Sequence, residues 1–490
     1  MANHYHGLAP FKGLELLQSF NDSEPGRFAR LLPELPPLYV NPLTLHKIGE
    51  ANGVMEDRGL PNLSKTVELG LIFFGQFIDH DITLDDSSSL SSNNVPSKVD
   101  NVRTPTLDLD SVYGEGPEAS PYLYKDGLYL LTGADYAGNF TDEQWLRLAA
   151  KDLPRNPLGT AIIGDPRNDE NRVISQMQLG FLRFHNAVVD SLKDRPGAPT
   201  GSKLFEDARR VATWHYQWVV LNHFLRTICG DWIVDDILAN GRKIYVPEYE
   251  ADGDVEPFIP IEFATAAYRF GHSMIVEKFR VQQGEDQFPL FGDRYGNGFT
   301  PLPNLRAVVD WETLLDSGNG DFERAGQLDT KLASTLLNLP FLPAELPAFE
   351  RSLATRNLLR AQSFLIPSGE QVANLMIQYG AKEITSEMIE HVSEAAKRLG
   401  DLDKGTPLWL YLLQEGQTIG RMNNDGKFER GEGLGPVGAR FVAETIIGLM
   451  ELDDRSFLGT NRNWSPMDSH DKLGPNGVTN LYDLLTFGDN

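Results

Sequence analysis

Apolar residues recur every three or four positions along most of the chain, which is the repeat of an amphipathic helix. The clearest case runs from Lys65 to Asp81, with Ser64 as the predicted N-cap. Its apolar residues fill one broad face: Leu69, Ile72, Phe73, Phe77 and Ile78. Alternating apolar and polar positions, the mark of strands, are scarce. The pattern therefore predicts a mainly α-helical protein with few short strands.

The same repeat predicts helices in several later segments and gives a simple domain organisation. These segments are residues 142–150, 174–192, 204–229, 261–276, 330–337, 350–362, 368–375, 386–399, 407–416 and 438–450. Residues 1–63 are rich in Pro and Gly, which predicts an irregular N-terminal arm packed on the rest. Neither an internal repeat nor a clear linker divides residues 64–490, so we expect them to form one domain.

Composition and charge exclude several classes of protein. The chain has 490 residues, of which 41% are apolar, enough for a substantial core. Its formal net charge of −25 repels nucleic-acid phosphates, so we expect no nucleic-acid partner. The single cysteine, Cys229, excludes an intramolecular disulfide and any multi-cysteine zinc or iron–sulfur site.

The sequence shows neither a secretory signal nor a membrane span. Met1 to Gly13 lack a basic segment followed by a continuous apolar run. The most apolar segment, Val67 to Ile78, is too short to cross a bilayer and contains Glu68 and Gln76. We therefore expect a soluble protein that is cytoplasmic or exported by a route without an N-terminal signal.

The first chemical motif lies on the helix predicted over residues 65–81. Gln76 and His80 are four residues apart, so both side chains project from the same helix face. Asp79 and Asp81 flank this histidine, and burying so many ionisable groups is costly unless they coordinate or catalyse something. A core histidine bonded to a buried amide gives the same spacing, so the motif alone leaves both interpretations open.

A second motif places oxygen-bearing side chains at every second position from Thr104 to Asp110. Calcium is bound by several such oxygens from carboxylates, hydroxyls and backbone carbonyls. A half-buried edge strand produces the same alternation, so this segment predicts either structure.

Two further motifs carry charged side chains next to predicted helices. Arg167 and Glu170 lie near a helix start, where a capping cluster is the simpler explanation. His272 lies on the apolar helix predicted from Ala264 to Val276, where a lone histidine is more often a core residue than a ligand. Gly271 beside it would let a flat ligand approach the backbone.

Taken in order, these motifs resemble those of the animal-type haem peroxidases, the branch of the peroxidase and cyclooxygenase superfamily that includes myeloperoxidase, lactoperoxidase and peroxidasin. The matching segments are residues 75–81, 104–114, 164–170, 269–272, 353–360 and 435–436. The resemblance extends from about Gly26 to Phe457, and an ordered set is far more specific than one motif. The vertebrate cysteine framework is absent, so the chain looks like a bacterial member.

The resemblance implies a single large helical haem-peroxidase domain and a role for each motif. His272 would be the proximal ligand of the haem iron through Nε2, and Asn357 would accept a hydrogen bond from the other ring nitrogen. On the opposite face, His80 would transfer a proton between the peroxide oxygens. Arg167 would stabilise the developing negative charge, and Gln76 would hold distal water or a small anion.

The resemblance also implies contacts around the haem and a calcium site. Arg269 and Arg360 would lie near the haem, the latter paired with a propionate. Asp79 and Glu170 match the carboxylates that form ester bonds to a haem b derivative. Asn171 stands where myeloperoxidase has a methionine that forms a sulfonium link, so we expect two esters without that link. The implied calcium ligands are Asp81, Thr104, Thr106, Asp108 and Asp110.

The leading functional hypothesis is a haem-dependent peroxidase that reduces hydrogen peroxide and oxidises halides, thiocyanate or small aromatic donors. The alternative is a fatty-acid dioxygenase of the same superfamily. Such enzymes carry a radical-forming tyrosine three residues before the proximal histidine, where this chain has Arg269. Tyr268 is one residue off and is expected to point elsewhere. A non-catalytic haem-binding module is disfavoured because His80, Arg167 and Gln76 are all present.

Overall fold

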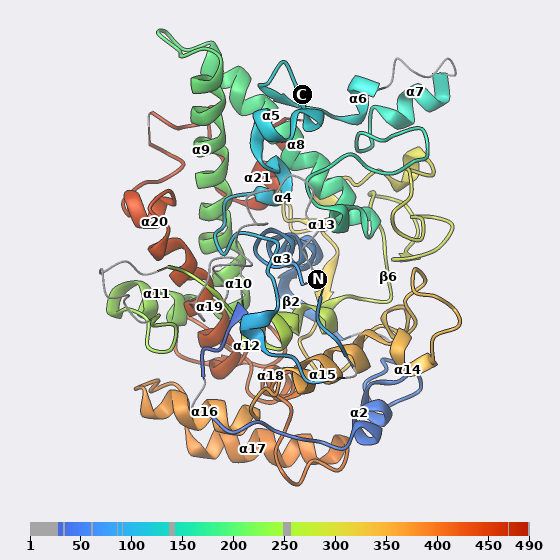
Figure 1. Ribbon diagram of the computed structural model, residues 1–490, viewed down its shortest axis with the longest axis vertical. Helices are drawn as coiled ribbons and strands as arrows, with labels where there is room; N and C mark the ends of the chain where they lie inside the picture. The colour runs from blue at the N-terminus through green and yellow to red at the C-terminus, as the bar shows by residue number, and fades with distance from the viewer. Residues whose placement is uncertain are drawn as a thin grey trace.

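The computed structural model describes residues 28–488, except 33–34, 60–61, 86, 91, 137–142, 248–255 and 469. Helices dominate this part of the chain, and the strands are short (Figure 1). The fold is 48% helical, which confirms the predicted mainly α class. No helix within the described ranges is long and apolar enough to cross a membrane.

The strands of the described part form two-stranded sheets that tie distant segments together. The pairs are β1 (Phe28–Ala29) with β5 (Ile259–Pro260), β2 (Leu63–Glu68) with β8 (Arg324–Gly326), β3 (Tyr124–Lys125) with β4 (Tyr129–Leu130), β6 (Lys278–Phe279) with β7 (Phe288–Pro289), and β9 (Arg421–Met422) with β10 (Phe428–Glu429). Only β1 and β5 run parallel. The β1–β5 pair holds the described end of the N-terminal arm, where buried Glu262 accepts hydrogen bonds from Leu31 N (3.0 Å) and Leu32 N (3.3 Å).

The remainder of the predicted arm is more regular than expected. Residues 1–27 lie outside the described part, but α2 (Pro42–Gly49) is a helix capped by the Asn41 side chain. It packs on α15 (Leu353–Ser363), where a Cβ on Gly49 would come within 2.6 Å of Thr355 N. Only glycine allows this approach. The division of the chain after residue 63 stays a prediction.

Helix α3 (Leu69–Ile82), which carries His80, starts later than the sequence predicts. Residues 63–68 are the strand β2, because the Glu432 carboxylate accepts hydrogen bonds from Lys65 N (2.9 Å) and Thr66 N (3.1 Å) and holds the segment extended. Ser64 donates to the same carboxylate at 2.7 Å and does not cap a helix. The predicted N-cap is therefore wrong.

The predicted helix over residues 204–229 exists but contains a rare turn. It comprises α9 (Ser202–Val219), the π-helical turn η6 (Val220–Leu225) and α10 (Arg226–Cys229), and α8 (Arg172–Lys193) packs beside α9. π-helical turns are uncommon and frequently occur at functional sites. Phe224, in η6, lies against Gly75 of α3, where a Cβ would come within 3.0 Å of its ring.

The predicted helix over residues 261–276 is broken. Helix α12 (Ile261–Thr265) ends at Ala266 (φ −137°, ψ −67°), and the 3₁₀ helix η7 (Ala267–Met274) follows. Residues three apart eclipse each other in a 3₁₀ helix, so Arg269 and His272 share one face. This break aligns the two side chains in a way that an α-helix would not.

The remaining helices surround these elements. They are α4 (Asp110–Tyr113), α5 (Gly116–Ala119), α6 (Gly133–Tyr136), α7 (Glu143–Ala149), α11 (Asp231–Asn240), α13 (Trp311–Leu314), α14 (Ala348–Arg351), α16 (Gly369–Gln378), α17 (Ser386–Ala396), α18 (Leu408–Thr418), α19 (Pro436–Leu452), α20 (Phe457–Thr460) and α21 (Leu481–Thr486), with 3₁₀ helices η2 (Pro96–Lys98), η3 (Pro121–Leu123), η5 (Pro166–Asp169), η8 (Leu305–Ala307), η9 (Ser334–Leu337) and η10 (Lys397–Leu399). Of the helix predicted over residues 330–337, only η9 forms. Helices α18 and α19 are almost wholly buried, and both contact η7, as α3 does. The core therefore fixes both η7 and α3.

Candidate active site

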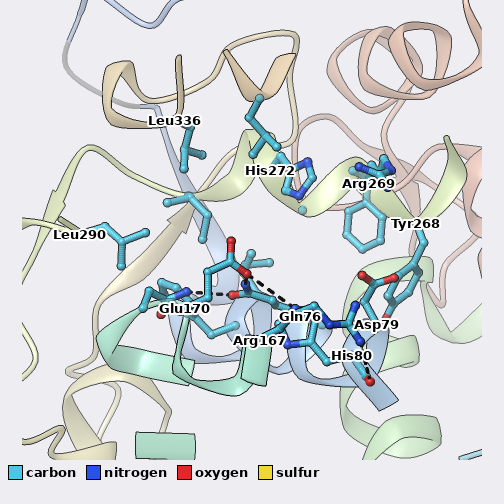
Figure 2. Close-up of a pocket in the computed structure, with 18 of the residues that line it drawn as sticks. Gln76, Asp79, His80, Arg167, Glu170, Tyr268, Arg269, His272, Leu290 and Leu336 are labelled. Carbon is cyan, nitrogen blue, oxygen red and sulfur yellow. Dashed lines mark hydrogen bonds and ion pairs between the residues drawn. The ribbon is translucent and has the colours of Figure 1, made fainter. Parts of the chain in front are cut away.

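A cavity of about 280 Å³ lies between α3 and η7. Figure 2 shows His272 on one wall and His80, Arg167, Gln76 and Glu170 on the opposite one. Apolar side chains complete the lining, among them Ile72, Phe73, Phe224, Ile275, Leu290 and Leu336. The structure thus brings together motifs that are far apart in the sequence.

His80 is oriented by Asn168, which was not among the predicted site residues. Its Nδ1 lies 2.7 Å from Asn168 Oδ1, and Asn168 Nδ2 donates to Gln178 Oε1 at 2.8 Å. Because the Asn168 oxygen faces the ring, Nδ1 carries the proton and Nε2 is left unprotonated. Burial, followed by the charge of Arg167, lowers the pKa of His80 to about 4. The only sequence signal was an amide directly after the motif arginine.

Arg167 is fixed by the carbonyl groups at the end of α3 and by a buried carboxylate. Its Nη2 donates to His80 O (3.0 Å), Thr83 O (2.6 Å) and Asp165 Oδ2 (2.8 Å). Its Nε donates to Asp165 Oδ1 at 3.1 Å. Among the described residues Nη1 has no hydrogen-bond partner, so it remains as a donor for a molecule in the cavity.

Asp165 is shared by two arginines, and sequence reasoning gave it no role. Its carboxylate also lies 2.9 Å from Arg103 Nη2. Burial alone would raise the pKa of Asp165, but Arg167 and Arg103 outweigh it and hold the pKa well below its ordinary value. Because Arg103 also contacts Asp110 at 3.3 Å, it links this carboxylate to the acidic cluster described below.

Gln76, Asp79 and Glu170 line the cavity as predicted. Gln76 Nε2 donates to Glu170 Oε2 at 3.3 Å, and the same oxygen is 3.9 Å from His80 Nε2. Burial raises the pKa of Glu170 to about 7, although Arg167 opposes the shift. Asp79 Oδ1 accepts a hydrogen bond from Thr83 Oγ1 at 3.0 Å. Two carboxyl groups therefore reach the cavity.

On the other wall, His272 and Asn357 are paired, but in the opposite direction from the one expected. Asn357 Nδ2 lies 2.8 Å from His272 Nδ1, while Arg269 Nη1 donates to Asn357 Oδ1 at 2.9 Å. A guanidinium only donates, so it takes the amide oxygen and turns the amide N–H toward the ring. Burial, followed by Arg269, lowers the pKa of His272 to about 3, so the ring is neutral.

Tyr268 and Arg360 also differ from expectation. Tyr268 was expected to point elsewhere, but it lines the cavity, and its buried hydroxyl has no hydrogen-bond partner among the described residues. Arg360 is absent from the described lining and contacts Asp85 at 3.2 Å.

An acidic cluster lies directly behind His80. Oxygens of Asp81, Asp108 and Asp110 are within 4.8 Å of one another. Burial and the other two carboxylates raise the pKa of fully buried Asp81 well above its ordinary value.

Of the two predicted threonine ligands, one joins this cluster. Thr104 bonds to it through Oγ1 (2.9 Å to Asp108) and through N (3.2 Å to Asp110), whereas no hydrogen bond joins Thr106 to it within the described residues. The edge-strand alternative is excluded, because residues 104–109 turn, Leu109 has a φ of 61° and α4 follows.

Comparison with known proteins agrees with this geometry. The family model for animal haem peroxidase matches residues 88–291. Chorion peroxidase of Drosophila melanogaster is 29% identical over 185 residues, which cover 36% of this chain and 22% of that protein. Over residues 88–291 the chain is therefore similar to the animal haem peroxidase family. It spans about a quarter or less of the length of the first curated relatives it matches. The bacterial affinity expected from the missing cysteines stays a prediction.

Solved structures of a peroxidase and of a fatty acid alpha-dioxygenase share the fold. Peroxidase A from Dictyostelium discoideum superposes with a TM-score of 0.58 at 16% identity, covering 89% of both chains. A fatty acid alpha-dioxygenase of Arabidopsis thaliana gives 0.57 at 15% identity, covering 95% of this chain and 78% of that one. At such identities the likeness shows the fold alone.

The residues around the cavity fit the haem that similarity to this family implies. His272 presents a neutral ring, and Nε2 has no partner among the described residues. Beside it, a Cβ on Gly271 would meet only Ile72 Cγ2, at 3.5 Å, so the space there is not filled by protein. The apolar lining suits a porphyrin, and Arg269 at its edge suits a carboxylate.

Proposed function

We propose that the protein is a haem-dependent peroxidase that reduces hydrogen peroxide. The observation that carries this proposal is the pair of buried, neutral histidines, His80 and His272, on opposite walls of one cavity. Bound haem would supply an iron that exchanges electrons with the peroxide. The protein would hold it through His272 and leave the opposite wall to bind the substrate.

The wall around His80 is suited to moving one proton within hydrogen peroxide. Unprotonated Nε2 of His80 accepts the proton from one peroxide oxygen and returns it to the other. Arg167 Nη1 donates to the oxygen on which negative charge develops. Because Asn168 and Asp165 hold these two groups in place before the substrate arrives, little reorganisation is needed.

On the His272 wall, binding a metal requires a change of tautomer. With Asn357 donating to Nδ1, the ring proton sits on Nε2, which faces the cavity. Metal binding at Nε2 therefore requires the proton to move to Nδ1 and the amide to turn over. Arg269 opposes that turn until it releases the amide oxygen.

The test of this function is an optical spectrum of the haem-loaded protein before and after brief treatment with hydrogen peroxide. We expect a high-spin Soret band that changes with peroxide and collapses in His272→Ala. The matched control is His391→Ala, an exposed histidine on α17, which should behave as the wild type. Absence of specific haem binding, or equal binding by His272→Ala, would overturn the proposal.

The pH dependence tests the role of Asn168. Since His80 acts in its neutral form and its pKa is about 4, kcat/KM for peroxide should fall only as the pH drops through about 4. Asn168→Asp places an anion on Nδ1–H and favours the charged ring, which should move this acid limb up by roughly 1 to 3 pH units. Stopped-flow rates measured between about pH 3 and pH 8 locate this acid limb. An acid limb that does not move in Asn168→Asp would contradict the role of Asn168.

We further propose that Asp79 and Glu170 form ester bonds to methyl groups of the haem, without a sulfonium link. Each ester replaces a methyl C–H bond by a C–O bond, with hydrogen peroxide as the two-electron oxidant that is reduced to water. Both carboxyl groups line the cavity, and Asn171 has no sulfur to form that link. Acidified solvent should leave the haem of the wild type on the protein and extract it from Asp79→Val with Glu170→Gln. If acidified solvent extracts all the haem from the peroxide-treated wild type, the ester proposal is wrong, whereas the peroxidase proposal stands.

We also propose that Asp81, Asp108 and Asp110, with Thr104 beside them, bind calcium. Close carboxylates repel each other, and a cation removes that repulsion. Calcium at about 100 times its Kd should raise the free energy of unfolding by about 2.7 kcal/mol. Urea unfolding with and without a chelator measures the effect, which Asp108→Asn should abolish. Equal stability in both conditions would exclude the site.

The electron donors proposed are halides, thiocyanate and small aromatic molecules. Arg167 Nη1 and the Gln76 amide give the polar end hydrogen-bond donors that small anions need, and the apolar lining suits an aromatic ring. Competition between bromide and a phenol in steady-state turnover would rank the two classes.

A second candidate, a fatty-acid dioxygenase, is favoured by the unpartnered Tyr268 hydroxyl in the cavity. Against it, the position three residues before His272 is Arg269. Oxygen uptake with palmitic acid by the haem-loaded protein, lost in Tyr268→Phe, would support this candidate. No uptake with normal peroxide turnover would exclude it.

A further inference from the structure

Asn171 uses the two ends of its amide for different partners. It is the N-cap residue of α8, where its Oδ1 accepts a hydrogen bond from Ile174 N at 3.0 Å. Its Nδ2 donates to Gln76 Oε1 at 3.1 Å. The side chain is buried and lines the cavity. It therefore connects the start of a long helix to a side chain at the candidate site.

The helix start decides which way this amide faces. A backbone N–H only donates, so the Asn171 oxygen must face Ile174 and its N–H bonds must face away. An amide N–H in turn requires an oxygen, so Gln76 must present Oε1 to Asn171. The Gln76 nitrogen then faces Glu170 Oε2, at 3.3 Å. Each orientation follows from the previous one, starting from the backbone of α8.

These hydrogen bonds leave Gln76 with only a hydrogen-bond donor to present to the cavity. Its oxygen is taken by Asn171, and one N–H is taken by Glu170. Within the described residues, the second N–H has no partner. Gln76 therefore offers the cavity a hydrogen-bond donor and no acceptor, as Arg167 Nη1 does. Small anions and the oxygens of a peroxide accept hydrogen bonds, so this arrangement suits both.

We propose that Asn171 is a positioning residue that sets the Gln76 amide with its N–H toward the cavity, and thereby selects anionic, hydrogen-bond-accepting ligands. This inference rests on the proposed haem function for its ligand, but the orientation of Gln76 does not require haem. The simpler role of Asn171, capping α8, predicts no effect on ligand binding once another capping residue replaces it.

The variant that separates the two roles is Asn171→Ser. Serine caps helices about as well as asparagine, but it has no N–H, and its hydroxyl lies one bond closer to the backbone than the amide nitrogen that reaches Gln76. In haem-loaded ferric protein, optical titration with fluoride should give a Kd about fivefold higher in Asn171→Ser, the loss expected for one hydrogen bond. Urea unfolding of the same variant should stay close to that of the wild type.

Two controls decide whether the effect passes through Gln76. In a Gln76→Leu background, adding Asn171→Ser should change the fluoride Kd no further, because the donor is already gone. Asn480 caps α21 through a 2.9 Å bond from Asp483 N, and Asn480→Ser should leave fluoride binding unchanged. Equal fluoride Kd values in wild type and Asn171→Ser, or additive effects in the double variant, would overturn the proposal.

A measurement without haem keeps this result separate from the proposed function. In protein labelled with ¹⁵N at glutamine, the side-chain signals of Gln76 are identified by their loss in Gln76→Leu. Their protons should exchange faster with water in Asn171→Ser than in the wild type. Unchanged exchange would overturn the positioning role even if haem binds as proposed, while failure of the wild type to bind haem would leave this test valid.

Discussion

His80→Leu is expected to lower kcat/KM for hydrogen peroxide by about 100- to 10,000-fold, the usual contribution of a positioned general base. Burial and the charge of Arg167 keep the imidazole neutral, and Asn168 orients its lone pair toward the cavity. Leucine fills a similar volume but accepts no proton. The loss should appear at all pH values above about 4, because the base is already neutral there.

Stopped-flow measurement of the reaction with peroxide checks this result, with His391→Leu as the control for replacing an exposed histidine. Soret absorbance must show that His80→Leu still binds haem. The competing base is Glu170, whose Oε2 is 3.9 Å from His80 Nε2 and whose pKa is about 7. If the rate is unchanged in His80→Leu but falls when Glu170→Gln is added, the proton transfer belongs to Glu170.

The second large effect is expected for Arg440→Met, which should lower the free energy of unfolding by about 3 to 5 kcal/mol. Arg440 is fully buried in α19 and contacts three carboxylates: Glu383, Glu444 at 2.9 Å and Asp236 at 2.7 Å. Removing the guanidinium leaves Glu383 and Glu444 buried without their cation. Since α19 contacts η7, His272 should lose its support as well.

Urea unfolding of the haem-free protein measures this loss. Lys397→Met, which breaks the exposed pair with Glu394 on the surface, is the control and should change stability little. Adding Glu383→Leu to Arg440→Met should recover part of the loss, because one unpaired buried charge disappears. If Arg440→Met unfolds at the same urea concentration as the wild type, the charge cluster does not stabilise α19.

The sequence predicted long amphipathic elements well and failed where a distant side chain decides the backbone. Helix α8 forms close to its predicted bounds because its pattern is local and strong. Lys65 and Thr66 are extended instead of helical because Glu432, far along the chain, binds their N–H groups. Helix α11 escaped prediction although Gly230 and Gly241 mark its two ends. Glycines at these two positions could have been used to predict the ends of this helix.

The candidate site shows the same division. Motif order placed His80, Arg167, Gln76 and His272 around one cavity, as the structure has them. The hydrogen-bond partners of these residues, such as Asn168 and Asp165, were not predicted as site residues because amides and carboxylates are common near helix starts. The direction of the Asn357 hydrogen bond was wrong, since it depends on Arg269 occupying the amide oxygen. Residue type alone does not reveal such competition.

The two walls of the cavity come from opposite ends of a long stretch of chain, and this has a consequence for biosynthesis. His80 leaves the ribosome well before His272, and at synthesis rates of about 5 to 20 residues per second the delay is roughly 10 to 40 seconds. Asn357 and α19, which support His272, follow later still. The nascent chain thus exposes an unfinished apolar wall during translation. If the protein binds haem as proposed, binding belongs after Asn357 and α19 have been synthesised, and chaperone protection is most needed before that point.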